Sequence, residues 1–317
     1  MKTIRDIAKM QEFSLQLHLG GLRVGFVPTM GYLHEGHLTL VRRARAECDV
    51  VVVSIFVNPT QFDRRDDFEA YPRDEERDRR LLEAERVDVL FMPRAEEVYP
   101  PGAATRVHIE GLTETLCGPR RPGHFDGVAT VVAALFNMVR PDVAYFGEKD
   151  YQQLQIIRRM VADLHFPIRI ESVPTVREPD GLAMSSRNAR LDAEQRKAAL
   201  ALSRGLAAAA RAYEEGVCEA ARLLAIAREP IDREPRVRLE YIELVDGTSL
   251  RPVEEARADS VLAVAAWLGD VRLIDNVILG RGLTGESDAD ADEIPPVITI
   301  GEDDSERRGE GSAGACE

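Results

Sequence analysis

The sequence predicts an α/β fold in which a doubly wound parallel sheet is followed by a smaller α+β domain. Residues 24–28 and 50–56 are short, β-branched and apolar on both faces, as strands buried in a parallel sheet are. Residues 35–48 lie between them and place apolar side chains along one helical face. This strand–helix–strand order recurs further along the chain, and a run of helices followed by strands replaces it near the C-terminal end.

The rest of the first domain alternates in the same way. Three helical patterns are each followed by an apolar strand-like run: residues 73–85 then 89–91, 126–139 then 143–146, and 151–164 then 168–170. Residues 1–13 read as a charged amphipathic helix without the apolar core of a signal peptide, so we expect a cytoplasmic location. No apolar run approaches the ~18–20 residues that a membrane helix needs, so no membrane partner is expected.

The pattern changes after about residue 187. Residues 192–228 are rich in alanine, glutamate and arginine and are expected to be helical, with a break near Gly216. Three strand-like segments follow, at residues 239–245, 261–267 and 271–279. We therefore predict three parts: a larger domain over 1–187, a smaller α+β domain over 188–280, and an acidic, disordered tail over 281–317.

Charge and cysteine content exclude several classes of protein. The 317 residues carry a formal net charge of −14, which disfavours nucleic-acid binding through phosphate contacts. An acidic total still permits phosphate ligands, because a site can concentrate a few cations locally. The four cysteines (Cys48, Cys117, Cys218 and Cys316) are scattered without CxxC spacing, which argues against a disulfide framework or a cysteine-built zinc site.

The segment from Pro28 to His37 carries the strongest functional signal. It follows the first strand and opens the first helix, where ligands of open α/β sheets bind and free N–H groups attract phosphate. His34 and His37 are three apart and lie on one helical face, where they can donate hydrogen bonds to phosphate oxygens. Gly31 and Gly36 allow the backbone to approach a ligand closely. A metal site is the weaker interpretation because H-x-x-H supplies only two ligands, and two incidental helix-cap histidines are a further alternative.

The sequence FGEKDYQQ again joins a buried strand to a helix, so it is expected at the same edge of the sheet. Lys149 can neutralise a triphosphate as a compact point charge. Asp150 can cap the following helix or hold a ribose hydroxyl. The alternative is an ordinary strand-to-helix turn with capping charges.

A third segment, MSSRN, offers two hydroxyls and a guanidinium that suit β- and γ-phosphates: Ser185, Ser186 and Arg187. The alternative here is a serine N-cap before the helix predicted from residue 192. Residues 121–127, RPGHFDG, precede another apolar helix and are either a flexible cover over the site or a turn with a cap.

Two glutamines lie near the same edge of the sheet. Gln61 follows the second strand, and Gln153 lies one turn into the helix after Lys149. Neutral amides can fix a hydroxy acid without adding charge beside its carboxylate. Either residue taken alone could equally be a surface glutamine.

Together these motifs resemble the pantothenate synthetase family of the nucleotidyltransferase superfamily, which has an HxGH-type motif. The resemblance rests on PTMGYLHEGH, VSIFVNPTQF, RPGHFDGVATVV, YFGEKDYQQL and DGLAMSSRN, in this order and spacing, and on the later AAWLGDVRLIDN. It runs from Val24 to Asn276 and implies a Rossmann-like catalytic domain that binds ATP and pantoate, in a homodimer. Family members normally end near Gly280, so the acidic tail is a departure that leaves the site residues unaffected.

The resemblance also implies the role of each site residue. Four are implied as catalytic, with the first as proton donor: His37, His34, Lys149 and Arg187. Pantoate is expected to bind Gln61 and Gln153, and β-alanine to bind Gln61. ATP is expected to contact a larger set: Met30, Gly31, Tyr32, Leu33, His34, Glu35, Gly36, His37, Gly147, Glu148, Lys149, Asp150, Val176, Met184, Ser185, Ser186 and Arg187.

The implied reaction joins pantoate to β-alanine through a bound pantoyl adenylate. Mg²⁺ is expected to arrive with ATP as substrate, and neither a tightly bound cofactor nor a protein-built metal site is expected. The main rival is an adenylyltransferase that transfers AMP to a phosphorylated acceptor and stops. A non-catalytic nucleotide-binding protein would be expected to have lost site residues, and none is lost. A tRNA-charging role lacks an anticodon-binding domain and a basic face.

Overall fold

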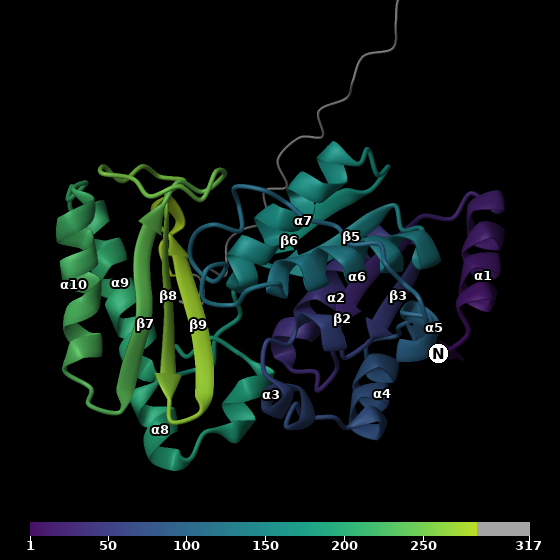
Figure 1. Cartoon of the computed structure of the whole chain (residues 1–317), viewed down its shortest axis with the longest axis horizontal. Coiled ribbons are helices and arrows are strands. Elements are labelled where there is room, and N and C mark those ends of the chain that lie inside the picture. The colour runs from purple at the N-terminus through teal and green to yellow at the C-terminus, as the bar shows by residue number, and fades with distance from the viewer. Residues whose placement is uncertain (284–317) are drawn as a thin grey trace, which may run out of the picture. The chain divides into compact units, whose positions relative to one another are not determined.

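Six parallel strands form the larger of two sheets, in the order β1-β4-β3-β2-β5-β6 (Figure 1). The computed structural model describes residues 1–283. The strands are β1 (Lys2–Ile4), β2 (Val24–Thr29), β3 (Val50–Ile55), β4 (Val89–Phe91), β5 (Val143–Gly147) and β6 (Arg169–Val173). Every neighbouring pair is parallel, which confirms the predicted doubly wound sheet.

Helices cover both faces of this sheet. Three of them share a hydrophobic core with one face: α1 (Ile7–Leu19), α6 (His124–Val139) and α7 (Tyr151–Asp163). Two others share a second core with the opposite face: α2 (Glu35–Glu47) and α4 (Glu75–Ala84). Alternation along β2 accounts for the division, because Phe26 points into the first core and Val27 into the second.

The central strands diverge at their carboxyl ends. β2 pairs with β3 along its whole length, from Val24 to Thr29. It pairs with β5 only through Gly25 with Val143 and Phe26 with Ala144. Beyond these pairs the two strands separate, which opens a crevice where the strand order reverses.

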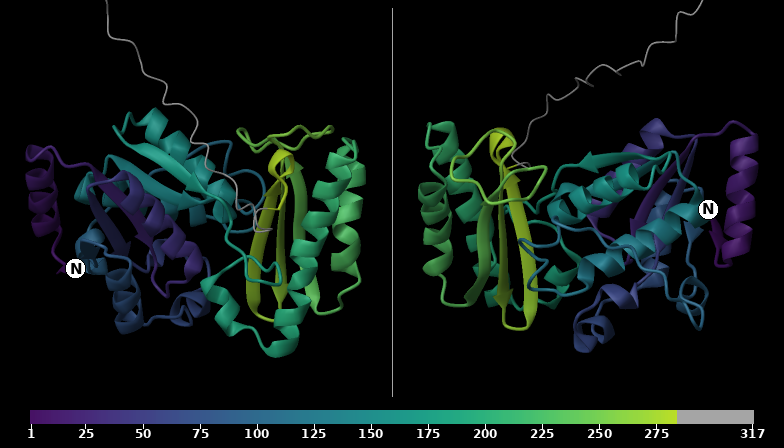
Figure 2. Two further views of the ribbon diagram at one scale, coloured as in Figure 1. Left: turned by 180° about the vertical axis from the view of Figure 1, so that it is seen from behind. Right: turned by 45° about the horizontal axis from the view of Figure 1, so that its top comes forward.

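The smaller sheet is antiparallel, with order β7-β8-β9. Its strands are β7 (Val237–Val245), β8 (Val261–Leu268) and β9 (Val271–Ile278), and three helices precede it: α8 (Ala193–Ala198), α9 (Leu200–Glu214) and α10 (Ala220–Asp232). Helices α9 and α10 lie along one face of this sheet in each view (Figure 2). Along β8, Leu262 and Val264 pack against those helices, whereas Ala263 and Ala265 pack toward the core shared with α6 and α7. β8 is therefore buried on both faces.

Several local predictions differ from the structure. Residues 1–13 are not a single helix, because the short strand β1 pairs with β4 before Asp6 caps α1. The predicted break near Gly216 separates α9 from α10, but a further break after Ala198 was not predicted, so residues 192–228 contribute to three helices, and Asp192 is the N-cap of the first. Helix α6 begins at His124, two residues before its predicted start. Three residues are too few to show a strand period, so nothing local marks β1.

The remaining elements of the described chain are short: η1 (Pro59–Gln61), α3 (Arg65–Glu69), α5 (Ala95–Val98), η2 (Glu148–Asp150), η3 (Ser186–Arg190) and, after β9, η4 (Leu279–Arg281). The described residues belong to one compact unit, so the domain boundary after residue 187 stays a prediction. The tail predicted over 281–317 lies outside the described residues, apart from its first three. Within residues 1–283, no helix is both long and apolar enough to cross a membrane.

Candidate active site

A cavity of about 240 Å³ lies in the crevice between the carboxyl ends of β2 and β5. Segments that follow four strands of the larger sheet line it, as the sequence predicts for ligands of an open α/β sheet. Most of the predicted site residues meet here: Met30, His34, Gly36 and His37 after β2; Gln61 after β3; Gly147, Lys149, Asp150 and Gln153 from β5 onward; and Val176, Met184, Ser185, Ser186 and Arg187 after β6.

Five residues that were expected at ATP do not line the cavity: Gly31, Tyr32, Leu33, Glu35 and Glu148. The Leu33 side chain is buried in the core below the site. Glu35 forms an ion pair with Arg42 on its own helix. Buried Glu148 accepts a hydrogen bond from Ser172. Their neighbours in the motifs face the cavity instead.

Asp78 on α4 shapes the loop after β2 and was not identified from the sequence. Its buried carboxylate accepts hydrogen bonds from the N–H groups of Tyr32 and Leu33, each at 2.7 Å. Burial raises the pKa of this carboxyl, although the two N–H donors oppose the shift. At Gly31, where φ is +81°, an added Cβ would lie 2.9 Å from Ile55 Cγ2. The loop is therefore fixed by a contact 46 residues away in the sequence.

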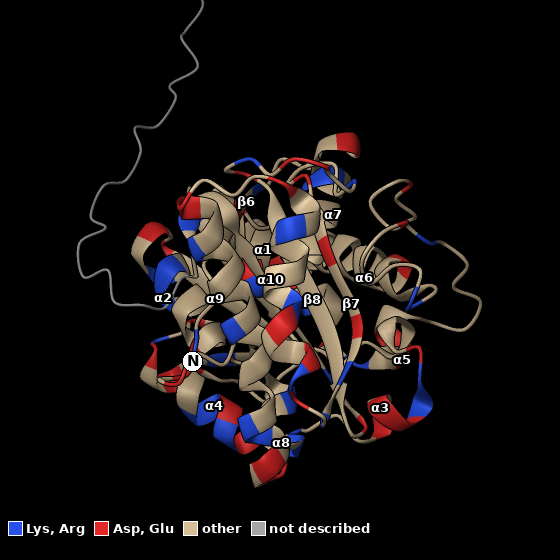
Figure 3. Cartoon of the chain, turned by 90° about the vertical axis from the view of Figure 1, so that its left-hand side faces the viewer, with Lys and Arg blue, Asp and Glu red and all other residues tan. Residues whose placement is uncertain are grey.

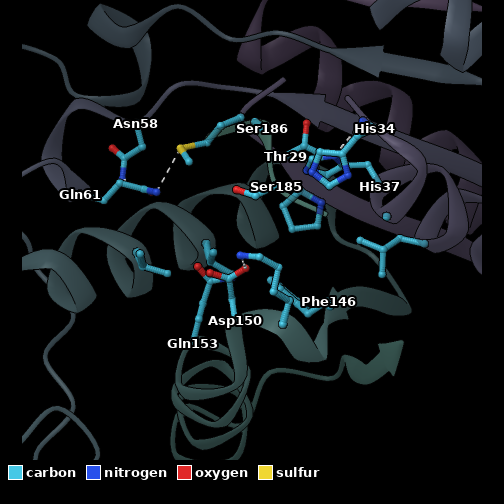
Figure 4. Close-up of a pocket in the computed structure, with 18 of the residues that line it drawn as sticks. Thr29, His34, His37, Asn58, Gln61, Phe146, Asp150, Gln153, Ser185 and Ser186 are labelled. Atoms are coloured by element: carbon cyan, nitrogen blue, oxygen red, sulfur yellow. Dashed lines mark hydrogen bonds and ion pairs between the residues drawn. The ribbon is translucent and has the colours of Figure 1, made fainter. Parts of the chain in front are cut away.

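The rings of the two histidines at the start of α2 lie against each other, with centroids 4.1 Å apart and planes tilted by 46° (Figure 4). Burial, reinforced by the nearby charges of Lys149 and Arg77, lowers the pKa of His34 to about 4. Burial and the neighbouring His34 lower the pKa of His37 to about 3. His37 Nδ1 accepts the backbone N–H of His34 at 3.3 Å, which places its own proton on Nε2. Both rings are neutral at pH 7, and each keeps one N–H to donate.

Gln61 is held by a network that joins η1 to α6. Buried Asn58 donates from Nδ2 to Gln61 Oε1 and to the Gly127 carbonyl, both at 3.1 Å. Gln61 Nε2 in turn contacts Met30 Sδ at 3.1 Å (Figure 4). At Gly127 an added Cβ would lie 2.5 Å from the Thr60 carbonyl oxygen, so only glycine allows this approach.

The RPGHFDG segment is a fixed helix start rather than a free loop. His124 Nδ1 donates to the Gln61 carbonyl at 2.7 Å, and His124 Nε2 accepts from Arg121 at 3.1 Å. Burial, together with the Arg121 charge, lowers the pKa of His124 to about 3, so this ring is also neutral. Arg121 is itself paired with Asp63 at 2.9 Å. His124 lines the cavity. From the sequence, its segment was expected to be either a flexible cover over the site or a turn with a cap.

The two adjacent glutamines of α7 point to different places. Gln153 faces the cavity beside Asp150 (Figure 4). Gln152 is buried and accepts the N–H of Cys117 at 3.0 Å, so it holds the segment that precedes α6. Lys149 is 18% exposed and lies 3.8 Å from the Asp150 carboxylate. Asp150 is the N-cap residue of α7, as one of its two interpretations predicted, but within the described chain its side chain makes no capping hydrogen bond there.

The loop after β6 brings Ser185, Ser186 and Arg187 to the cavity. Ser185 accepts the N–H of Arg187 and so caps η3 rather than the helix that starts after Asp192. Ser186 Oγ donates to the Tyr32 carbonyl at 3.2 Å, which links this loop to the one after β2. Arg187 is paired with Asp67 of α3 at 3.0 Å.

The site combines donors for a polyanion with neutral amides for a hydroxy acid. Three neutral imidazoles, an ammonium, two guanidinium groups and the hydroxyls of Ser185 and Ser186 line one cavity together with two glutamines. Among residues 1–283, no three histidine, cysteine or carboxylate side chains lie close enough together to hold a metal. Outside the site, basic and acidic residues are interspersed on α4 and α8 and form local pairs such as Arg79 with Glu75 (Figure 3).

Known proteins resemble the chain over nearly all of its described length. A family model for pantoate-beta-alanine ligase matches residues 2–278. A pantothenate synthetase from Thermotoga neapolitana is 54% identical over 280 residues, which cover 88% of this chain and 100% of that protein. Pantothenate synthetase 1 from Bradyrhizobium diazoefficiens is 54% identical over 280 residues, covering 88% and 98%.

Solved structures agree with this relationship. The pantothenate synthetase from Thermus thermophilus superposes with a TM-score of 0.83 at 49% identity, covering 88% of this chain and 99% of that one. The pantoate-beta-alanine ligase from Francisella tularensis, complexed with beta-gamma ATP and beta-alanine, gives a TM-score of 0.73 at 34% identity, covering 90% and 100%. The predicted resemblance is thereby confirmed, and the chain belongs to the pantoate–β-alanine ligase family.

Proposed function

We propose that this protein is an AMP-forming ligase that condenses pantoate with β-alanine at the expense of ATP, giving pantothenate, AMP and pyrophosphate. One observation supports this most strongly. Donors for a triphosphate and amides for a hydroxy acid converge on one cavity at the strand-order reversal. Membership in the pantoate–β-alanine ligase family identifies the proposed substrates, and the structure of the Francisella relative is a complex with beta-gamma ATP and beta-alanine.

In the first proposed step, the carboxylate of pantoate attacks the α-phosphorus of Mg–ATP. The α–β phosphoanhydride bond breaks, and pyrophosphate leaves with the electron pair. Pantoyl adenylate stays bound. The amine of β-alanine then attacks the acyl carbon, AMP leaves, and the new amide bond is that of pantothenate. Mg²⁺ enters with ATP and offsets phosphate charge.

Each part of the cavity has a proposed task. Lys149, Arg187 and the hydroxyls of Ser185 and Ser186 hold the phosphates, with the backbone around Gly36 and Gly147 close by. Gln61 and Gln153 hold the hydroxyls of pantoate and keep its carboxylate free of a strong cation that would weaken it as a nucleophile. Aligning two anions and stabilising charge at phosphorus are then the main contributions to rate.

The neutral histidines fit the same role. His34 and His37 each present an N–H without adding a charge that must be desolvated. A bound triphosphate raises the pKa of a neighbouring imidazole because it favours the charged form. His37, with its proton on Nε2, can therefore donate more strongly as charge builds on the phosphate oxygens.

Two further properties are proposed from the family resemblance. We propose that the enzyme is homodimeric, which light scattering of the purified chain at several concentrations would test. We also propose a cytoplasmic location, which fractionation of the cells that produce the protein would test.

The decisive experiment measures AMP formation from Mg–ATP. It is run with pantoate and β-alanine together, and with each omitted in turn. AMP that forms only with both substrates would support the ligase reaction. Pyrophosphate release that continues without an amine, and without AMP, would favour the adenylyltransferase alternative. No AMP under any condition, from protein with a cooperative unfolding transition, would overturn the proposal.

A further inference from the structure

Within residues 1–283, the cavity is lined only by residues up to Arg187, yet two adjacent residues of the C-terminal sheet reach the loops that form it. These residues, Asp275 and Asn276, lie on β9. Asn276 donates from Nδ2 to the Glu148 carbonyl at 3.0 Å and to the Lys149 carbonyl at 2.9 Å. One amide group thus holds two successive peptide units of η2, the turn that carries Lys149.

The neighbouring residue holds the other phosphate-facing loop. Asp275 forms a two-point ion pair with Arg177, at 2.8 and 2.9 Å, and both side chains are 4% exposed. Arg177 also donates to the Gly181 carbonyl, at the turn that leads to Met184 and the serines. The backbone of Met184 donates to the Val176 carbonyl beside it. β9 therefore braces the loop after β5 and the loop after β6 from one side.

We propose that Asn276 is a positioning residue that fixes Lys149 over the cavity, with Asp275 doing the same for the loop after β6 through Arg177. This inference rests on the proposed function, because it assigns Lys149 the task of holding phosphate. Fixing carbonyls 148 and 149 fixes the direction in which the Lys149 side chain leaves the backbone. A displacement of about 1 Å in a charged donor can lower turnover by ~10²-fold.

The Gln61 side of the cavity is held independently. Gln61 is fixed by Asn58, Gly127 and His124, none of which belongs to β9. The positioning role of Asn276 therefore predicts a selective defect. Gln153, the other glutamine proposed to bind pantoate, lies on α7 directly after η2. Loss of the two hydrogen bonds of Asn276 should therefore lower kcat/KM for ATP by a larger factor than it changes the KM for pantoate.

The test is a double-mutant cycle with Asn276→Ala and Lys149→Ala, assayed as AMP formation by the full chain. Asn276→Ala should lower kcat/KM for ATP by ~10-fold or more. It should add no further loss to Lys149→Ala, because the two residues act as one unit. The matched control is Asn137→Ala. In the wild type the Asn137 amide donates to the Ala133 carbonyl of its own helix, so this variant should leave activity unchanged.

The outcomes separate this inference from the proposed function. Wild-type kcat/KM in Asn276→Ala, or losses that multiply in the double variant, would overturn the positioning role. A wild-type chain that forms no AMP would overturn the proposed function instead. Positioning can then still be tested, since hydrogen exchange of the peptide spanning 147–153 should be faster in Asn276→Ala than in Asn137→Ala. If Asn276→Ala does not fold, Asn276→Ser, which keeps one donor, replaces it in the same cycle.

Discussion

The two sheets of this protein use their strand ends differently. All strands of the larger sheet run in one direction, so the segments that follow β2, β3, β5 and β6 arrive at one edge and build the cavity together. The smaller sheet is antiparallel, so its successive turns lie at opposite ends and cannot gather side chains at one edge. It contributes hydrogen bonds from the middle of a strand instead. The larger sheet thus brings the cavity-lining side chains together, and the smaller sheet holds their loops in position.

The largest expected effect tests whether the chemistry resides only in the larger sheet. Lys149→Ala should lower turnover by at least ~10²-fold, the loss typical of one electrostatic donor, and leave the unfolding temperature nearly unchanged. The matched control is Lys197→Ala on α8, an exposed lysine paired with Glu194, which should retain full turnover. Steady-state AMP formation measures both. Near-normal turnover of Lys149→Ala would remove this residue from the mechanism.

The next effect is on the stability of the fold in acid, and it should also arise from residues around the larger sheet. Three partly buried histidines in this region have lowered pKa values: His34, His37 and His124, at about 4, 3 and 3. Because the unfolded chain binds protons near pH 6.5 and the folded rings do not, stability is full above that pH and falls as pH drops toward 4. Each ring is expected to cost on the order of 2 kcal/mol at pH 4.

Urea unfolding at pH 7, 5 and 4 checks this expectation. The variant His124→Gln should lose less stability between pH 7 and 4 than the wild type, whatever its stability at pH 7. His165→Gln is the control, since that histidine is exposed at the end of α7. Equal pH slopes for wild type and His124→Gln would contradict a buried neutral ring at this position.

Two tightly packed glycines, one near the cavity and one far from it, allow the effect of overpacking on stability to be distinguished from its effect on pantoate binding. Ala at Gly127 on α6 would place Cβ 2.5 Å from the Thr60 carbonyl oxygen, and Ala at Gly205 on α9 would place it 2.2 Å from that of Ala227. Each variant should lose about 1 kcal/mol of folding free energy, since overpacking exceeds the gain in helix propensity. Only Gly127→Ala should also raise the KM for pantoate, because it displaces Gln61. Equal effects of the two variants on that KM would show that the Gln61 turn is insensitive to α6.

The smallest expected effect concerns the pairing of Arg187 with Asp67. Asp67 is also paired with Arg190 at 2.8 Å, and these guanidinium groups outweigh burial and lower the pKa of its carboxyl. Asp67→Asn should free Arg187 for the triphosphate and lower the KM for ATP about threefold, in line with a pair worth under about 1 kcal/mol. Asp270→Asn, which removes a partner of Arg190, is the control. A KM for ATP that rises in Asp67→Asn would mean that Asp67 supports the loop rather than competing with phosphate.

Sequence reasoning located the site because parallel topology makes position along the chain informative. Once a strand is recognised, the residues after it must lie at the shared edge, and His37, Gln61 and Lys149 all follow strands with clear apolar runs. Of the two adjacent glutamines of α7, only Gln153 faces the cavity. The roles of these residues stay predictions until the assays above are made.

The residues that support the site could not be found in this way. Asp78 looks like one charge among many in an exposed helix, and only its contact with the loop after β2 distinguishes it. Asn276 lies 127 residues from the carbonyl of Lys149 that it holds. β1 is too short for a period, and Asp67 gains its significance only from two distant arginines. Each depends on a long-range contact, which no local pattern encodes.

The separation of β2 from β5 has a consequence for binding. The Val24 carbonyl points toward β5, where it accepts the N–H of Asp142. The Thr29 carbonyl points toward β3, where it accepts the N–H of Phe56. Because successive residues of a strand alternate sides, Pro28 turns its nitrogen toward β5, where a ladder would need an N–H that proline lacks. Pro28 therefore cannot donate the next hydrogen bond of a β2–β5 ladder, and the pairing of these strands ends just before it. Pro28 thus favours an open crevice between β2 and β5. A ligand that enters the crevice does not have to break hydrogen bonds between these strands, so none of its binding free energy is lost in separating them.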